Sequence, residues 1–205
     1  MALENKLGIT ESSELARMEE KLSKQRALEL FETGALDRLE AGTFAALASI
    51  HRALFSDIYD FAGEKRTVNI AKGNFRFASV MYLDAALENI ERMPQSTFAE
   101  IVEKYVEMNI AHPFREGNGR SMRIWLDGML KKALGQVVDW SHIDKEDYLQ
   151  AMERSSVKDL EIKALLKAAL TNQVNDRSVY MKGIDASYHY EGYYTFRTED
   201  LAQSP

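Results

Sequence analysis

The residue types that a phosphate-handling site requires are concentrated in one segment, His112–Arg123, which reads HPFREGNGRSMR. Pro113 disfavours a helical conformation at the preceding residue, so we expect His112 to lie in a loop. Gly117 and Gly119 flank an asparagine and permit positive φ angles, which lets successive N–H groups converge into a nest for an anion. The N-terminus of the following helix adds its partial positive charge at the same place. The segment therefore predicts an anion site.

The charged side chains of this segment indicate which anion it would hold. Arg120 and Arg123 are three residues apart and share one face of the first helical turn, where two guanidinium groups suit a polyphosphate. Glu116 is a hard oxygen ligand for a Mg²⁺ ion that stays on phosphate oxygens. His112 can take up a proton near neutral pH. The segment predicts a nucleotide-phosphate site with a general base, although the chain has neither a Walker loop nor a Rossmann fingerprint.

The composition excludes several classes of protein. The chain has 205 residues, of which 45% are hydrophobic and 28% are charged, as expected of one soluble domain with an appendage. Its net charge of −6 gives no reason to expect direct nucleic-acid binding. The absence of cysteine removes disulfides, thiolate nucleophiles and cysteine zinc sites. We see neither a secretory signal nor an apolar stretch long enough to span a membrane, and we therefore expect a cytoplasmic protein.

Hydrophobic periodicity favours a mainly α fold with one short β-hairpin. Apolar residues from Val68 to Phe77 alternate around Lys72-Gly73-Asn74, which predicts the hairpin within residues 63–77. The mixed charges of the first helix indicate a solvated face. The expected helices are one from near Leu15 to near Gly34, one capped by Thr43, one from Val80 to Ile90, one from Phe98 to Ala111, one over 119–134 that ends at Gly135, one over 144–155 capped by Asp144, one over 157–171 with a capping box of Ser156 and Asp159, and one or two short helices over 176–193 that end at Gly192.

The segment from His112 to Arg123 resembles the signature of the Fic family, H-x-F-x-[DE]-G-N-G-R-x-x-R, at every specified position. The resemblance covers roughly residues 40–170 and implies the Fic fold, a helical core with one short β-hairpin flap. It divides the chain into an N-terminal helical extension (1–40), a Fic core domain (41–172) and a C-terminal inhibitory helix with a tail (173–205). The activity that it implies is a protein adenylyltransferase, which moves AMP from ATP to a Tyr, Ser or Thr hydroxyl of a protein and releases pyrophosphate.

The resemblance also implies a role for each signature residue, with ATP as the substrate, Mg²⁺ or another divalent cation as the cofactor, and a protein of unknown identity as the partner. These roles are proton removal from the target hydroxyl by His112, metal binding by Glu116, contacts to phosphate oxygens by Asn118 and the backbone of Gly117 and Gly119, stabilisation of the leaving pyrophosphate by Arg120, and binding of the γ-phosphate by Arg123.

Two further segments gain a function from the resemblance. The hairpin within residues 63–77 is similar to the family's target-docking flap, and its docking edge would be Ile70, Ala71, Lys72 and Gly73. The tail sequence SYHYEG, residues 187–192, matches the family's inhibitory pattern [ST]-x-x-x-E-[GN]. Ser187 and Glu191 would lie one turn apart on one helix face. In the family this glutamate pairs with the second arginine of the signature and takes the room of the γ-phosphate. The position of the motif resembles the small class with a C-terminal inhibitory helix.

Several alternatives stay open. Tyr188 and Tyr190 either pack the tail helix on the core or, being tethered near the site, serve for self-modification. A homo-oligomer also stays open. The same pocket could remove AMP if Glu191 orients a water molecule, or it could transfer another group such as phosphocholine or UMP. A non-enzymatic helical adaptor is the remaining alternative, against which the intact His112 speaks. Outside the signature, we expect His51 to be a core residue, His142 to lie at a turn or cap, and His189 to have no role.

Overall fold

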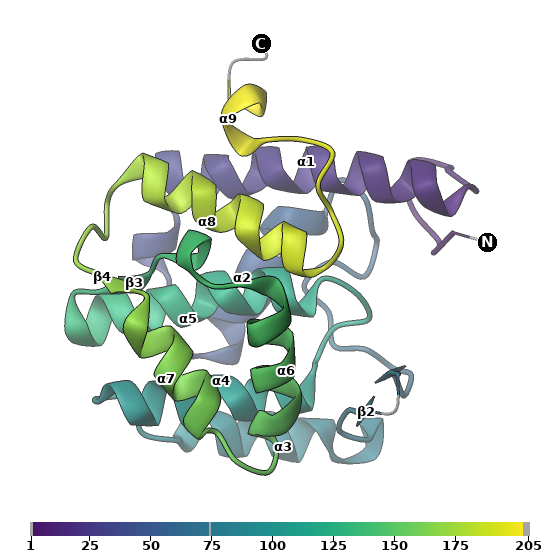
Figure 1. Cartoon of the computed structure of the whole chain (residues 1–205). Helices are drawn as coiled ribbons and strands as arrows, with labels where there is room; N and C mark the ends of the chain where they lie inside the picture. Colours follow the sequence, from purple (N-terminus) through teal and green to yellow (C-terminus); the bar gives the residue numbers. More distant parts are fainter. Residues whose placement is uncertain (1, 74, 203–205) are drawn as a thin grey trace.

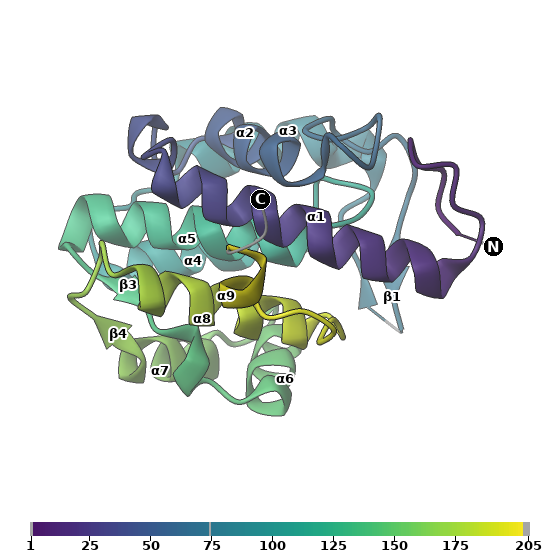
Figure 2. The same cartoon turned by 90° about the horizontal axis from the view of Figure 1, so that it is seen from above.

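Helix α5 (Asn118–Leu134) runs through the middle of the computed structural model, which describes residues 2–73 and 75–202 (Figure 1). Helix α5 packs against α2 (Phe44–Phe55), α4 (Phe98–Ala111) and α8 (Arg177–Tyr190). Figure 2 shows α1 (Ser12–Glu32) lying across the molecule between α2 and α8, and it contacts both of them. The other helical elements are η1 (Leu36–Arg38), α3 (Val80–Arg92), η2 (Trp140–His142), α6 (Lys145–Ser155), α7 (Leu160–Ala168) and α9 (Thr198–Leu201).

The core is formed where α2, α4 and α5 turn their apolar faces toward one another. The apolar residues of these helices recur every three or four positions, so that each helix has one continuous apolar stripe to bury. Fully buried members of this core are Leu47, Leu54, Phe55, Ile101, Val102, Tyr105, Met122, Trp125 and Leu126. Within the described part of the chain, no helix is both long enough and apolar enough to cross a membrane.

The ends of several helices confirm the predictions from sequence. The hydroxyl of Thr43 accepts a hydrogen bond from the N–H of Ala46 and so caps α2. Asp144 caps α6 through the N–H groups of the first turn. Gly34 and Gly135 adopt positive φ directly after α1 and α5, a conformation that costs glycine little. The mainly α class is therefore confirmed.

The expected helix over 157–171 was wrong at both ends. Ser156 ends α6, and the Asp159 carboxylate pairs with Lys163 at 2.6 Å and makes no capping bond. Strand β4 (Leu170–Thr171) follows α7 and pairs antiparallel with β3 (Val137–Val138). The structure thus contains a second short strand pair, which the sequence did not suggest.

The expected hairpin is present. Strand β1 (Ala71–Lys72) pairs antiparallel with β2 (Phe75–Arg76), with Ala71 opposite Arg76 and Lys72 opposite Phe75. Asn74, at the expected turn, lies outside the described residues. The pair is exposed on its outer edge and stands beside the end of α4, because the N–H of Ala78 donates to the carbonyl of Ile110 at 3.0 Å.

Candidate active site

His112 lies at the C-terminal end of α4 in a left-handed conformation, with φ 48° and ψ 64°. It is the one non-glycine residue with positive φ in the described part of the chain. Such a backbone costs about 1–3 kcal/mol and persists where the surroundings hold it. Pro113 excludes the helical region for His112, so α4 stops here and the imidazole turns toward the start of α5.

The imidazole of His112 is oriented by two neighbours. Its Nδ1 lies 3.0 Å from the carbonyl oxygen of Asn109, so Nδ1 carries the hydrogen and Nε2 is left to accept a proton. The ring of Phe77 stacks on the imidazole with centroids 3.6 Å apart. Burial lowers the pKa of His112 to about 4, and the positive charges of Lys72 and Arg66 act in the same direction. The imidazole is therefore neutral at pH 7.

Arg66 ties both ends of the flap to the end of α4, a role that sequence reasoning missed. Its side chain is buried, and its nitrogens donate to the carbonyl oxygens of Val68, Ala78, Ala111 and His112. Val68 and Ala78 lie on either side of the hairpin. The carbonyls of Ala111 and His112 stand at the C-terminus of α4, where they have no acceptor role within the helix and where a cation is favoured. Neither the position of Arg66 in the sequence nor its neighbours indicate these contacts.

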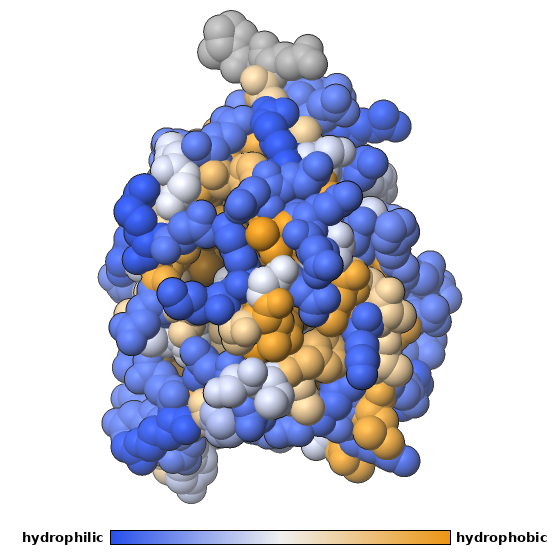
Figure 3. Space-filling model, turned by 90° about the vertical axis from the view of Figure 1, so that its left-hand side faces the viewer, coloured by the Kyte–Doolittle hydropathy of each residue, from blue (hydrophilic) through white to orange (hydrophobic). Residues whose placement is uncertain are grey.

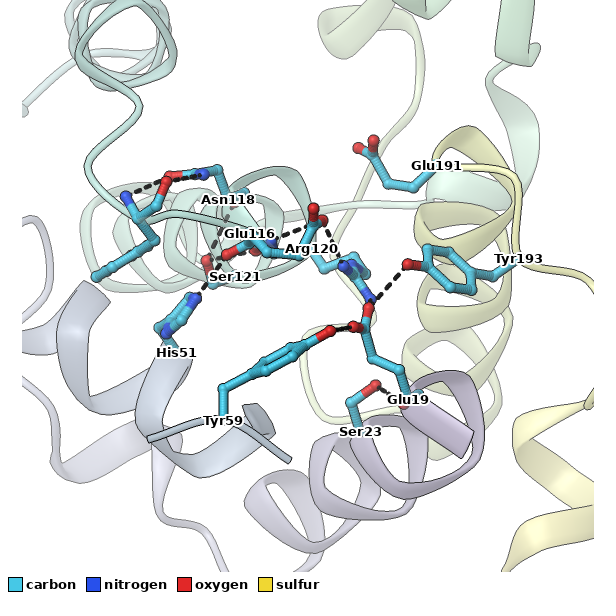
Figure 4. Close-up of polar contacts among 12 residues, drawn as sticks. Glu19, Ser23, His51, Tyr59, Glu116, Asn118, Arg120, Ser121, Glu191 and Tyr193 are labelled. Atoms are coloured by element: carbon cyan, nitrogen blue, oxygen red, sulfur yellow. Dashed lines mark hydrogen bonds and ion pairs between the residues drawn. The ribbon is translucent and has the colours of Figure 1, made fainter. Parts of the chain in front are cut away.

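The loop between His112 and α5 is braced from below, as Figure 4 shows. The Asn118 side chain accepts from the N–H of Phe114 at 2.8 Å and donates to its carbonyl at 2.7 Å. His51 is a buried core histidine, as expected, and its Nε2 donates to the carbonyl of Glu116 at 2.8 Å while its ring stacks on Phe114. A Cβ atom at Gly117, where φ is +77°, would overlap the ring of Phe55. These contacts together hold the backbone of the loop in its observed conformation.

The side-chain amide of Asn118 is engaged with the loop in a buried position. The main-chain N–H of Asn118 is among the first N–H groups of α5, which have no acceptor within the helix. Gly117 and Gly119 form this N-terminus. Glu116 stands at its edge with 46% of its side chain exposed, and its Oε1 accepts from the N–H of Gly117 and from Arg120.

Arg120 is enclosed by protein groups (Figure 4). One terminal nitrogen donates to Glu19 of α1, and the other donates to Glu116 at 3.0 Å. The guanidinium also lies over the rings of Phe55 and Tyr193, at 4.9 and 4.6 Å. Arg120 therefore connects α1 to the metal-ligand candidate, in addition to any contact with pyrophosphate.

The prediction of a solvated face on α1 was only partly right. Charged residues such as Glu14 and Arg17 are exposed, but Glu19, Glu20 and Lys24 are buried. Glu20 and Lys24 pair with each other, and Glu20 accepts from two main-chain N–H groups of the segment after α8. The buried charges of this helix make contacts to segments far away in the sequence, and a single helical pattern cannot reveal them.

Arg123 faces the end of α8. Its guanidinium donates to the Ser187 hydroxyl at 2.6 Å, to the Ser187 carbonyl at 2.8 Å, to Glu191 Oε1 at 2.9 Å and to the Tyr148 hydroxyl at 3.2 Å. The other carboxylate oxygen of Glu191 lies 3.3 Å from Nζ of Lys72, so the flap also contacts the tail helix. The structure thus brings together Arg123, Ser187, Glu191 and the flap.

Glu191 occupies the space above the N-terminus of α5. A Cβ atom at Gly119 would overlap Glu191 Oε1, which places the carboxylate directly against the first turn of the helix. Burial alone would raise the pKa of Glu191, but the charges of Arg123 and Lys72 outweigh it and lower the pKa to about 2. An anion therefore rests where a helix N-terminus binds anionic ligands.

The remaining candidate residues have clear places. Tyr188 and Tyr190 are buried against the core, and the Tyr190 hydroxyl lies 2.8 Å from the carbonyls of Trp140 and Ile143. Their hydroxyls are therefore inaccessible while α8 is packed, whereas Tyr194 is 81% exposed. His189 is exposed, and His142 ends η2 beside Asp139.

The docking-edge candidates Ala71, Lys72 and Gly73 are exposed and Ile70 is half-buried. No group of three or more metal-ligating side chains occurs in residues 2–73 and 75–202.

The fold and this geometry place a neutral imidazole beside a helix N-terminus, an arrangement that suits an anionic ligand. Residues 42–130 match the model of the Fic/DOC family. The Salmonella typhimurium protein named "Probable protein adenylyltransferase Fic" is 30% identical over 181 residues, which cover 82% of this chain and 88% of that protein. The chain belongs to the Fic/DOC family.

Other relatives agree with this membership. Protein adenylyltransferase VbhT from Bartonella schoenbuchensis is 30% identical over 88% of this chain, and the match spans 40% of the length of VbhT. The crystal structure of BepC from Bartonella tribocorum with bound AMPPNP has a TM-score of 0.68 and 22% identity, and the match covers 84% of this chain and 94% of that one. The latter likeness supports the fold.

Proposed function

We propose that this protein transfers AMP from ATP to a hydroxyl group of a target protein and releases pyrophosphate. The observation that carries the proposal is the placement of His112, whose Nδ1 is tied to Asn109 while Nε2 is left as a neutral base beside the N-terminus of α5. Relatives named protein adenylyltransferases and a related fold with bound AMPPNP support a nucleotide substrate.

In the transfer step, the target hydroxyl oxygen attacks the α-phosphorus, and His112 Nε2 takes the hydroxyl proton. The bond from the α-phosphorus to the bridging oxygen of the β-phosphate breaks, and the electron pair leaves with pyrophosphate. The first N–H groups of α5 hold the α-phosphate oxygens where charge develops, which stabilises the transition state without rearrangement of the site. Arg120 and Arg123 are the nearby cations for the leaving phosphates.

Glu116 would hold a Mg²⁺ ion, because its carboxylate is partly exposed at the edge of the phosphate cradle. A bound Mg²⁺ ion would neutralise charge on the phosphates. Arg120 donates to Oε1 of Glu116, which leaves the second carboxylate oxygen for the cation. Glu19 in turn fixes Arg120, so α1 contributes to the orientation of this ligand.

We further propose that α8 inhibits the enzyme. Glu191 holds an anionic charge above the first turn of α5 and occupies Arg123 at 2.9 Å. ATP would then meet a carboxylate where its γ-phosphate should go, and it would lose Arg123. The α-phosphorus would be misaligned, and a displacement of about 1 Å costs on the order of 100-fold in rate.

The flap supplies the proposed docking edge. Lys72 and Phe75 flank the turn and pair with each other, so the N–H and C=O of Ala71 face away from β2. An extended target segment could add to this edge through main-chain hydrogen bonds, which would present hydroxyls from different sequences to His112.

A hydrolytic activity is the second candidate. Glu191 is ionised and 21% of its side chain is exposed, so it could orient a water molecule toward a protein-bound AMP. Transfer of another phosphate-linked group would use the same cradle, because the residues assigned to it would contact phosphates and not the base.

The test uses ATP labelled at the α- or the γ-phosphate, a cell lysate as the source of acceptors, and the Glu191→Gly protein. We expect protein-bound label from the α-position alone. His112→Ala should reduce it by about 10²-fold or more, the scale of a lost general base, with little change in ATP affinity. His142→Ala is the matched control, because His142 is exposed on η2. Incorporation of γ-label above that of the lysate without added protein, or full incorporation of α-label without His112, would contradict the proposal.

A further inference from the structure

A cavity of about 900 Å³ lies on the side of α5 away from His112. Its walls come from the end of α1 with η1, from α2, from α5, from β3 with η2, and from α8 with the segment that precedes it. Figure 3 views this end of the molecule and shows apolar residues at the bottom of a hollow with a hydrophilic rim. Arg123 and Ser187 close its inner end. A cavity of this size can hold a small organic ligand.

Two glycines inside helices leave this cavity open. Gly128 of α5 and Gly183 of α8 line it, and neither has the positive φ that would require glycine. A glycine in a helix interior costs roughly 0.5–1 kcal/mol relative to alanine. A Cβ atom at Gly128 would meet nothing within 4 Å, and one at Gly183 would touch only Trp140, at 3.4 Å or more. Neither backbone conformation nor close packing explains these glycines, and what they provide is space.

Asp127 is the one carboxylate among the described lining residues that is not exposed, since Asp37, Glu40 and Asp176 lie at the exposed rim. Leu36, Val138, Trp140 and Ile184 supply apolar surface. Asp127 accepts one hydrogen bond on each oxygen, from the N–H of Val138 and from Nε1 of Trp140, both at 2.8 Å. Each oxygen keeps a further lone pair for a donor.

Asp127 has no cationic partner among the described residues. The other charged side chains of the wall form ion pairs or hydrogen bonds, or they lie at the exposed rim. Lys131 pairs with Asp37, and Arg123 is held by Ser187 and Glu191. Burial raises the pKa of Asp127 to about 7, as expected for a carboxylate that lacks a nearby positive charge. A ligand cation would supply the missing partner.

We propose that this cavity is a binding site for a small primary amine with an aromatic or branched apolar body. The body fills the space beside Gly128 and Gly183, and the ammonium group donates to Asp127. This site adjoins the inhibitory contact at Arg123 and Ser187 but includes neither His112 nor Gly117 and Gly119, and its assignment does not depend on the transferred group.

The test uses 2-phenylethylamine as the probe and 2-phenylethanol as a neutral analogue of similar shape. The protein has two tryptophans, and both Trp125 and Trp140 line the cavity, so intrinsic fluorescence reports binding directly. We expect the amine to bind at least about tenfold more tightly than the alcohol, because its hydrogen bond to Asp127 is charge-assisted. Asp127→Asn should remove this difference.

Gly128→Leu tests the cavity without reliance on Asp127, because leucine has a higher helix propensity than glycine and its side chain would enter open space. It should weaken binding of both probes at least about tenfold, a loss typical of a blocked apolar contact. Ala133→Leu, on an exposed position of the same helix, should leave binding unchanged. Absence of binding to the wild-type protein, equal affinity for the two probes, or undiminished binding to the Gly128→Leu protein would overturn the proposal.

Discussion

Replacement of Glu191 by glycine tests the inhibitory contact directly. The substitution removes the carboxylate that lies against the first turn of α5 and frees Arg123 from its 2.9 Å ion pair. It leaves His112 and the main-chain N–H groups of α5 in place. The residue follows the last turn of α8, so its loss does not interrupt the helix.

The size of the effect follows from the electrostatics of Glu191. Its surroundings lower its pKa from 4.5 to about 2, in spite of burial, because Arg123 and Lys72 stabilise the charge. One pKa unit corresponds to about 1.4 kcal/mol, so a drop of about 2.5 units stabilises the ionised carboxylate by about 3 kcal/mol, or roughly 300-fold. ATP must displace or tolerate this contact. We therefore expect AMP incorporation to rise by at least about tenfold, with roughly 300-fold as the upper limit.

The assay compares AMP incorporation by the wild type, Glu191→Gly, Glu191→Gln and Arg123→Ala at equal ATP and Mg²⁺. Glu191→Gln keeps the shape and removes the charge, so it should recover part of the gain. Arg123→Ala should not mimic the gain, because Arg123 is also the expected partner of the γ-phosphate. Equal incorporation by wild type and Glu191→Gly would refute inhibition by α8. Loss of an AMP-removing activity in Glu191→Gly would favour the hydrolytic candidate.

Three other outcomes are expected. Ala71→Pro removes a main-chain donor from the outward edge of β1, so transfer to external proteins should fall in a labelling assay; an equal fall in calorimetric ATP affinity would show that the hairpin serves the nucleotide. Arg66→Ala should lower the free energy of unfolding by about 2–4 kcal/mol in urea titrations, because buried carbonyls lose a charged donor. Arg66→Lys, which keeps a charged donor, should lose less stability than Arg66→Ala. A loss under about 0.5 kcal/mol in Arg66→Ala would refute the bracing role. The neutral form of His112 is lost only as the pH falls through its pKa of about 4. The value of kcat/KM should therefore be maintained from pH 7 to below pH 6.5 and fall as the pH approaches 4; a loss of activity that sets in at pH 6.5 or above would contradict the buried imidazole.

The parts of the site that were predicted from sequence are those that depend on a short continuous segment of the chain. Two glycines around Asn118 and a proline after His112 dictate a loop before a helix, whatever surrounds them. The braces of this loop could not be predicted. Glu19 meets Arg120 across 101 positions, and Arg66 meets His112 across 46. Such pairs depend on how helices pack, which a local pattern does not encode.

The same reason explains the errors in the fold. Residues 157–171 have a helical pattern, but Leu170 pairs with Val138, a partner more than thirty positions earlier in the chain. The side-chain bonds of Asn118 to the backbone of Phe114 were likewise not predicted from the sequence. A buried polar group must find a partner, and which partner it finds depends on the fold around it.

The most direct test of the central claim is the stoichiometry of the reaction. The Glu191→Gly protein is incubated with ATP, Mg²⁺ and lysate acceptors, and pyrophosphate release is measured beside protein-bound AMP identified by mass spectrometry. The transfer proposed for His112 predicts one pyrophosphate for each AMP attached to a hydroxyl, with both signals lost in the Glu191→Gly, His112→Ala double variant. Protein-bound AMP that survives loss of His112, or ATP turnover above that of the lysate alone without any attached AMP, would contradict it.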